Sequence, residues 1–430
     1  AVGLGSIWRF PYVVGQNGGA VFVILFCIFL LGISLPIMLS EIMIGRKTQT
    51  NPSDAFAKLG KNNFWKSLGT MQVVTGFLVS IFYSVVCSWT LGYFVESLFG
   101  NITNFQNAEE ARLFWKSCFK NPWWSIGYQT SFILMAVAVL YAGVQKGIEG
   151  TNKVLMPLLF CFLLFLAYIG LQLPGAYKGL DFLLTPDWSM LNGKVALVAL
   201  GQACFGLSVG QGTMVTYGSY LRKQDNLFKI SIPVTIAIVV VSLLAGVAIF
   251  TTLFSVGGEV TSGSELIFQA LPLVFSTMKL GALLAFLFFA LILFAGLTSQ
   301  ISAMEPFISY LTDHKKYSRQ KAVAICGFLV LIFGLPVGLS FGVLSGYQIF
   351  GTSLFDSLSF FCINILIPLG ALSAVILVSW KNPFSDFVNH IQKGAETFVK
   401  DNKLLQNFLL ISIKYLAPLV ILMILLNVFF

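Results

Sequence analysis

The sequence has 430 residues, of which 57% are hydrophobic and 10% charged, and its formal net charge is +9. A soluble domain does not expose that much apolar surface, so the composition excludes a water-soluble protein and indicates a polytopic α-helical membrane protein. Binding to nucleic acid is not predicted, because the basic residues are spread over alternate loops and not gathered with aromatic residues on one face.

The first predicted element, residues 1–11, is an interrupted span with the sequence AVGLGSIWRFP. Its two glycines, its arginine and its proline argue against a continuous helix. Open backbone at membrane depth must face protein or a water-filled cavity. In transporters, such a broken helix receives a carboxylate at the N-terminus of its half-helix and a cation at its freed carbonyls. The alternative is a glycine-rich seam for helix packing.

The apolar stretches that follow bring the number of predicted spans to about eleven. They cover residues 18–45, 67–99, 123–143, 152–173, 195–221, 228–256, 278–312, 319–340, 347–380 and 406–430. The span around residues 201–220 is broken by Gly206, Gly210 and Gly212 and is a second interrupted span. Two interrupted spans at corresponding places in two halves predict a transporter built from inverted repeats, with its site near the middle of the bilayer.

We therefore predict an all-α membrane fold of two inverted five-helix repeats with broken first and sixth helices. Residues 1–173 form the first repeat, residues 195–380 form the second, and residues 381–430 form a cytoplasmic connection and an additional C-terminal helix. The chain begins inside a span, so we expect its N-terminus to be truncated.

Positive charge predicts the orientation of the spans. The connections that we take as cytoplasmic contain 18 Lys or Arg residues, and the opposite connections contain six. Cytoplasmic loops carry the excess of positive charge, so the truncated N-terminus is also predicted to be cytoplasmic. The connections with the excess lie at residues 46–66, 146–153, 222–229, 315–321 and 381–403.

Catalytic chemistry has little support in the sequence. Six of the seven cysteines lie in apolar runs, and the two histidines lie in polar connections. We find no pair of nucleophile and base, no metal-ligand cluster and no phosphate-binding loop. An enzyme is therefore not predicted.

Several motifs resemble the neurotransmitter:sodium symporter family, whose bacterial members are amino-acid transporters. They are spread in order over nearly the whole chain, and the resemblance implies a sodium-coupled symporter of an amino acid that works by alternating access in a bacterial inner membrane. The matching strings are AVGLGSIWRFPY at 1–12, NGG at 17–19, GISLPIMLSEIMIGR at 32–46, SWTLG at 88–92, GVQKGIE at 143–149, TPD at 185–187, GQACFGLSVGQGTMVTYGSY at 201–220 and FAGLTS at 294–299.

The resemblance implies one sodium site between the first and eighth spans. Its ligands would be the backbone carbonyls of Val2 and Ala295 and the hydroxyl groups of Thr298 and Ser299. A shell of neutral oxygens suits a hard monovalent cation. The alternative is ordinary hydrogen bonding of the two hydroxyl groups to their own helix.

The family's other sodium site is not matched. Ser6 stands in place of an Asn, Gly206 in place of a hydroxyl residue, and Ile238 in place of a second Asn. A desolvated ion without those oxygens would be costly, so one sodium ion is predicted.

The match to the family's chloride site is also incomplete. Gln202 and Ser242 fit this site, whereas Phe26 replaces a tyrosine and Gly206 replaces a hydroxyl residue. Chloride binding is therefore not predicted.

The substrate is predicted to be an amino acid. Gly3 stands where the family's monoamine carriers have an aspartate, so a bare amine would lack an acidic partner. A carboxylate would instead meet the helix N-terminus at Leu4 and Gly5. By resemblance, Tyr83 binds this carboxylate and Phe205 covers it. The pocket for the side chain would be lined by Val79, Ser208, Gln211, Ser299 and Ala303.

The resemblance also implies two gates. Arg9 matches the extracellular gate; its usual acidic partner position is Ser359, and Asp356 one turn earlier would substitute through water. Tyr220 and Asp313 match the cytoplasmic gate. A proton-coupled carrier, an uncoupled carrier and a substrate receptor on the same fold are the alternative functions.

Overall fold

The computed structural model describes residues 3–142, 144–255, 257, 266–395 and 402–429. In these ranges, eight helices are long and apolar enough to cross a membrane. Together with α8 (Val144–Gln172) and the two interrupted spans, they account for the eleven predicted spans. The predicted all-α polytopic fold is confirmed.

The first part of the chain contains η1 (Gly5–Arg9), α1 (Phe10–Gln16), α2 (Ala20–Phe29), η2 (Leu30–Ser34), α3 (Leu35–Thr48), α4 (Pro52–Gly60), α5 (Asn63–Leu98), α6 (Ala108–Lys120), α7 (Pro122–Ala142), α8 and α9 (Ala176–Leu184). The middle part contains η3 (Trp188–Met190), α10 (Gly193–Gly206), α11 (Thr213–Tyr220), α12 (Leu227–Ser255), α13 (Leu266–Ser276), α14 (Gly281–Asp313) and α15 (Arg319–Leu339). The last part contains β1 (Gln348–Ile349), β2 (Thr352–Ser353), α16 (Leu354–Phe360), η4 (Phe361–Leu366), α17 (Ile367–Ile376), η5 (Leu377–Lys381), α18 (Phe384–Gln392), α20 (Lys403–Ile411), η6 (Ser412–Leu416) and α21 (Ala417–Phe429).

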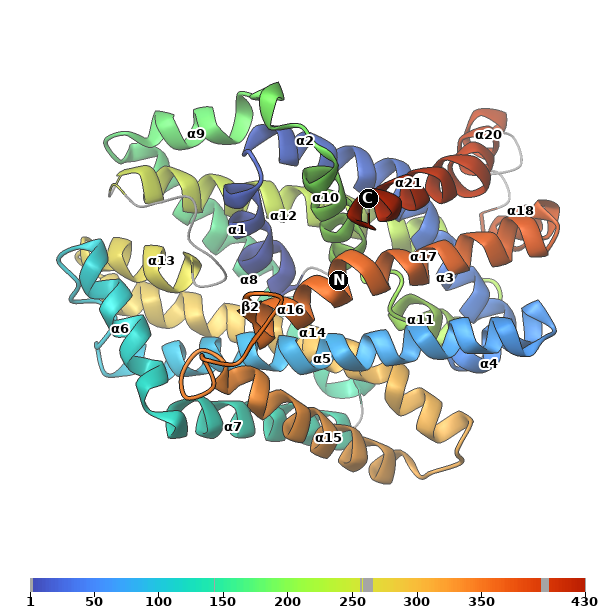
Figure 1. Cartoon of the computed structure of the whole chain (residues 1–430), viewed down its shortest axis with the longest axis horizontal. Coiled ribbons are helices and arrows are strands. Elements are labelled where there is room, and N and C mark those ends of the chain that lie inside the picture. Colours follow the sequence, from blue (N-terminus) through green and yellow to red (C-terminus); the bar gives the residue numbers. More distant parts are fainter. Residues whose placement is uncertain (1–2, 143, 256, 258–265, 396–401, 430) are drawn as a thin grey trace.

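The long helix α5 crosses the molecule along its long axis (Figure 1). The short helices α6, α9 and α13 gather at one end, and α4 and α18 lie at the other (Figure 1). We call these the α6 end and the α4 end. Arg46 lies at the α4 end, where its guanidinium donates to the backbone oxygen of Asp225, 2.6 Å away, in the basic connection 222–229. Connections with the excess of positive charge therefore meet at the α4 end.

Asparagine side chains cap the N-termini of α4 and α5 at the α4 end. The side-chain oxygen of Asn51 accepts a hydrogen bond of 3.1 Å from the backbone N–H of Asp54, and Asn62 caps α5 in the same way through the N–H of Trp65. Each cap satisfies a backbone donor that has no partner inside its helix. The polar connection between α3 and α5 therefore forms the additional helix α4.

A cluster of aromatic rings fixes the α6 end. The ring of Trp89 on α5 lies 5.1 Å from that of Trp115 on α6, 5.8 Å from that of Phe268 on α13 and 5.3 Å from that of Phe355 on α16. Tilted and edge-on aromatic pairs of this kind add packing energy to the burial of apolar area. The cluster holds the short helices against the long helix α5.

Candidate functional site

The first interrupted span starts with residues that do not continue a regular helix. Gly3 accepts a backbone hydrogen bond of 3.2 Å from Ser6, and the π-helical turn η1 begins at Gly5. Pro11 lies in the first turn of α1, where its missing N–H breaks no bond of that helix. Helical structure therefore begins at Leu4 and Gly5.

The sixth span is interrupted between α10 and α11. Ser208 has a φ of 54°, and Gly210 and Gly212 each have a φ of 77°. This left-handed backbone is what glycine adopts readily and other residues rarely do. Gly210 and Gly212 therefore favour the open backbone of segment 207–212, in which Ser208 also takes a left-handed conformation.

Glu41 on α3 holds this open segment in place. Its Oε1 accepts a hydrogen bond of 2.9 Å from the backbone N–H of Gly210, and the amide of Gln72 on α5 donates to the same oxygen over 3.3 Å. The Gln72 amide also donates to the backbone oxygen of Gly370 on α17, 2.9 Å away. Backbone that has left its helix is thus satisfied by side chains of neighbouring spans.

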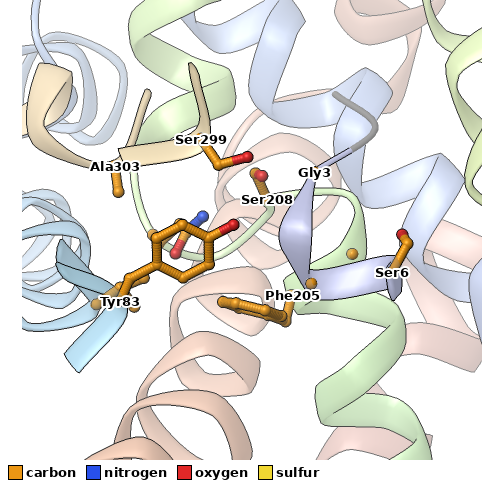
Figure 2. Close-up of a pocket in the computed structure, with 11 residues that line it drawn as sticks. Gly3, Ser6, Tyr83, Phe205, Ser208, Ser299 and Ala303 are labelled. Carbon is orange, nitrogen blue, oxygen red and sulfur yellow. The ribbon is translucent and has the colours of Figure 1, made fainter. Parts of the chain in front are cut away.

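The two interruptions meet at a cavity of about 40 Å³. We call it the central pocket. All predicted substrate residues except Leu4 line it, whereas the Leu4 side chain is fully buried beside it. Figure 2 shows Tyr83, Ser208 and Ser299 around the pocket next to Gly3. Its lining residues are Gly3, Gly5, Ser6, Val79, Tyr83, Phe205, Gly206, Ser208, Gln211, Ser299 and Ala303.

Polar groups of the central pocket converge on the first span. The Tyr83 hydroxyl faces the side chain of Ser299 and the backbone of Leu4 and Gly5. A Cβ on Gly3 would lie 2.2 Å from Ser299 Oγ, so no larger residue fits there without displacement. None of the described residues that line the pocket is acidic.

Arg9 and Phe205 close the pocket toward the α6 end. Arg9 is 4% exposed, and its guanidinium donates to the side-chain oxygen of Gln202. The amide of Gln202 donates in turn to the backbone oxygen of Gly5 over 3.3 Å, and Arg9 lies 5.8 Å from the centre of the Phe205 ring. Gln202 therefore joins the two interrupted spans above the pocket, a role that the sequence did not reveal.

A cavity of about 1200 Å³ opens above this closure at the α6 end, and it shares no lining residue with the central pocket. Arg9, Asp356 and Ser359 all line this outer cavity. The carboxylate of Asp356 accepts a hydrogen bond of 2.7 Å from Ser353, and no ion pair joins it to Arg9 in the described chain. Arg9 and Asp356 therefore face one cavity without an ion pair between them.

A second cavity, of about 590 Å³, leads toward the α4 end. We call it the inner cavity. It shares Ser208, Gln211, Ser299 and Ala303 with the central pocket, and Thr298 also lines it. In this structure the central pocket is therefore connected toward the α4 end and closed toward the α6 end.

The predicted cytoplasmic gate residues have separate partners. The Tyr220 hydroxyl donates to Glu305 over 2.7 Å, and Arg319 donates to both oxygens of the same carboxylate at 2.9 and 3.0 Å. Asp313 accepts a hydrogen bond of 3.0 Å from the backbone N–H of Asn51. Arg319 was not predicted from the sequence, although a carboxylate inside an apolar helix requires such a cation.

The predicted sodium ligands on α14 lie within one helical turn. The Thr298 hydroxyl donates to the Ala295 carbonyl over 3.0 Å, and Ser299 faces the first span at Gly3. These neutral oxygens suit a sodium ion. The hydrogen bond from Thr298 to its own helix is also the arrangement expected of a helix that binds no ion. Val2 lies outside the described residues.

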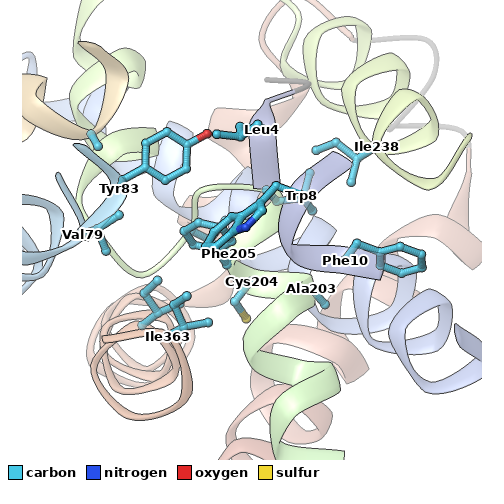
Figure 3. Packing of buried hydrophobic residues seen from close by; sticks show 14 of the residues in the cluster. Leu4, Trp8, Phe10, Val79, Tyr83, Ala203, Cys204, Phe205, Ile238 and Ile363 are labelled. Carbon is cyan, nitrogen blue, oxygen red and sulfur yellow. The ribbon is translucent and has the colours of Figure 1, made fainter. Parts of the chain in front are cut away.

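Hydrocarbon occupies the region of the unmatched sodium site. Ile238 on α12 is fully buried, and its Cγ2 would lie 3.5 Å from a Cβ on Gly206. Figure 3 shows Ile238 beside the first interrupted span, among buried apolar side chains. Of the chloride residues, Gln202 already donates to Gly5, and the Phe26 ring packs 4.9 Å from that of Phe10.

Comparison with known proteins gives concordant matches. The model of the sodium:neurotransmitter symporter family matches residues 1–126 and 117–430. The uncharacterized sodium-dependent transporter YhdH of Bacillus subtilis is 36% identical over 99% of this chain and 94% of its own length. An uncharacterized sodium-dependent transporter of Haemophilus influenzae is 36% identical over 88% of this chain and 85% of its own length. The crystal structure of MhsT in complex with L-phenylalanine has a TM-score of 0.94 at 36% identity, covering 99% of this chain and 95% of MhsT.

Proposed function

The chain belongs to the sodium:neurotransmitter symporter family, and we propose that it moves one zwitterionic amino acid together with one sodium ion across a bacterial inner membrane. The observation that carries this proposal is the central pocket, where Tyr83 and the open backbone of the first span converge without an acidic side chain.

The pocket supports a substrate that brings its own carboxylate. The backbone at Leu4 and Gly5 begins a helix, whose partial positive charge attracts an anion, and the Tyr83 hydroxyl faces the same place. An amine without a carboxylate would leave these donors unpaired and would find no counter-charge among the described lining residues. MhsT, whose structure was solved in complex with L-phenylalanine, agrees with this substrate class.

The oxygens of α14 support the single ion. Thr298 and Ser299 supply hydroxyl groups near the Ala295 carbonyl, and both line the inner cavity. Ile238 and Gly206 offer no side-chain oxygen for a second sodium ion. The amide of Gln202, which a chloride ion would need, already donates a hydrogen bond to Gly5.

The cavities support alternating access. We assign the α4 end to the cytoplasm because it holds connections with the excess of positive charge. The central pocket then faces the cytoplasm in this structure, while Arg9, Gln202 and Phe205 close the opposite side. Opening of that closure, with closure of the inner cavity, would expose the pocket to the other side.

Uptake of radiolabelled amino acids into proteoliposomes tests the proposal, with and without an inward sodium gradient. We expect concentrative uptake only with the sodium gradient. Uptake driven equally well by a pH gradient in sodium-free buffer would replace sodium with proton coupling, and equilibration without any gradient would indicate an uncoupled carrier.

Thermal-shift measurements test the substrate class separately. One or more L-amino acids should stabilise the protein, whereas the matching decarboxylated amines should not. Equal stabilisation by the amines would contradict the role given to the carboxylate.

A further inference from the structure

Gln211 has a buried polar group that the functions described above leave unused. The residue is 3% exposed, and its side-chain oxygen Oε1 has no hydrogen-bond partner among the described residues. Gln211 lines both the central pocket and the inner cavity. A buried acceptor without a partner is costly, and this one belongs to a residue that lines both cavities.

The main chain around Gln211 is fixed on both sides. Its neighbour Gly210 donates to Glu41, as described above. The backbone oxygen of Gln211 lies 2.7 Å from where a Cβ on Gly76 of α5 would stand, so only a glycine there allows this contact. The side chain of Gln211 is therefore presented to the pocket from a rigid support, as a specificity residue requires.

Small residues leave room next to the amide. Ser208, Ser299 and Ala303 accompany Gln211 at the junction of the central pocket and the inner cavity. The carboxylate position at Leu4 and Gly5 belongs to the first span, and Gln211 belongs to the sixth. A bound amino acid held by its carboxylate would thus have its side chain available to this junction.

We infer that Gln211 selects the side chain of the substrate: its Oε1 accepts a hydrogen bond from a neutral donor on that side chain, such as a hydroxyl, an amide or an indole N–H. This inference rests on the proposed function and names the substrate class of the same pocket. An analogue of equal shape without the donor is disfavoured, because it buries the amide oxygen unpaired.

Competition binding with isosteric pairs of amino acids tests the inference. The pairs are tyrosine with phenylalanine, threonine with valine, and glutamine with methionine, each measured against the wild-type protein and against Gln211→Leu. We expect the member with the donor to bind about ten-fold more tightly in the pairs that fit, in line with one buried hydrogen bond. In Gln211→Leu, this ratio should fall to about one or reverse.

Gln129→Leu is the matched control. Gln129 is an equally buried glutamine with an unpartnered Oε1, but it lies between α5, α7 and α15, where its amide donates to Ser84 over 3.1 Å. The ratio should persist in this variant. Equal affinities within every pair for the wild-type protein, or a ratio that persists in Gln211→Leu, would overturn the inference alone. Failure of every L-amino acid to bind would overturn the proposed function with it.

Discussion

Thr298 and Ser299 together supply the two hydroxyl groups of the proposed sodium site. Replacement of both by alanine should abolish sodium-dependent substrate binding, because only backbone oxygens would remain. Thr298→Ser keeps its hydroxyl and should bind sodium almost as the wild-type protein does. The measurement is substrate binding as a function of sodium concentration, and the wild-type curve should have a Hill coefficient of about one, as a single bound ion requires. A coefficient near two would reveal a second ion with ligands elsewhere, such as Ser6 and the substrate carboxylate.

Asp356 and Ser359 compete for the role of acidic or polar partner of Arg9. Asp356 faces the same outer cavity as Arg9, whereas the Ser359 hydroxyl donates to the backbone oxygen of Asp356 over 3.1 Å, within its own helix. Asp356→Ala should therefore lower the rate of uptake at least several-fold, and Ser359→Ala should leave it nearly unchanged. Uptake rates in proteoliposomes measure both, and the opposite ranking would show that the closure depends on Ser359.

Residues could be assigned from the sequence where a motif fixed both their type and their span. Phe205, Ser208 and Ser299 were predicted in this way, Tyr83 was predicted from the resemblance at its single position, and the structure places all four on one pocket. Partners from distant segments could not be predicted. Gln202 was considered only for chloride, and its bond to Arg9 depends on how two interrupted spans approach each other.

At the scale of elements, the tenth span touches the open segment of the sixth through two glycines. A Cβ on Gly370 would lie 1.9 Å from the backbone oxygen of Gly210, so Gly370→Ala forces the two backbones apart. Overpacking of this kind costs about 1–3 kcal/mol. We expect a lower Tm for this variant in detergent.

Gly127→Ala provides the control for this substitution. Gly127 lies inside α7, and a Cβ there would meet no atom within 4 Å. Alanine is the better helix former by about 1 kcal/mol, so this variant should be at least as stable as the wild-type protein. Equal losses of stability in both variants would show that the contact between Gly210 and Gly370 is not the cause.

Helix α18 is held at the α4 end by hydrogen bonds from Arg46, and we expect this attachment to weaken at low pH. The guanidinium of Arg46 donates to the backbone oxygen of His390. Burial, followed by the charges of Lys47, Lys393 and Arg46, lowers the pKa of His390 from 6.5 to about 4. The attached state therefore excludes a proton that the detached state accepts, so attachment weakens as the pH falls from about 6.5 toward 4.

Hydrogen exchange measures this attachment. Protection of residues 384–392, corrected for the pH dependence of intrinsic exchange, should decrease between pH 7 and pH 5 in the wild-type protein. His390→Gln keeps the backbone oxygen that Arg46 binds and should show constant protection. A decrease of the same size in this variant would assign the pH dependence to another group.

The boundaries of most helices could be predicted from hydropathy, because apolar residues continue until a charged or turn-forming residue ends them. The predicted span 347–380 was an exception. Residues 348–353 are apolar enough to extend the span, but they form the hairpin of β1 and β2 and α16 begins at Leu354. The π-helical turns such as η2 and η4 were not predicted, since one extra residue in a turn leaves no trace in composition.

At the scale of the whole molecule, two interruptions about two hundred residues apart meet at one pocket, although each looks like an isolated defect in its own span. We propose from this that residues 1–173 and 195–380 are the two repeats and that they move relative to each other around the pocket. The number of ions and the chemistry of the substrate depend on a few side chains within this frame.

If one sodium ion is transported, as we propose, the isoleucine at position 238 has an energetic consequence for the cell. With one cation per zwitterion, each transport cycle carries one net charge inward, and a membrane potential of 100 mV contributes about 2.3 kcal/mol. The membrane potential alone allows the substrate to accumulate roughly fifty-fold. The sodium concentration ratio multiplies this limit. A carrier with two ions would square both factors, but it would also spend twice the sodium on every molecule it collects. Under the proposed coupling to one ion, the methyl groups that Ile238 places beside Gly206 would therefore lower the limit of accumulation and halve the sodium used for each molecule of substrate.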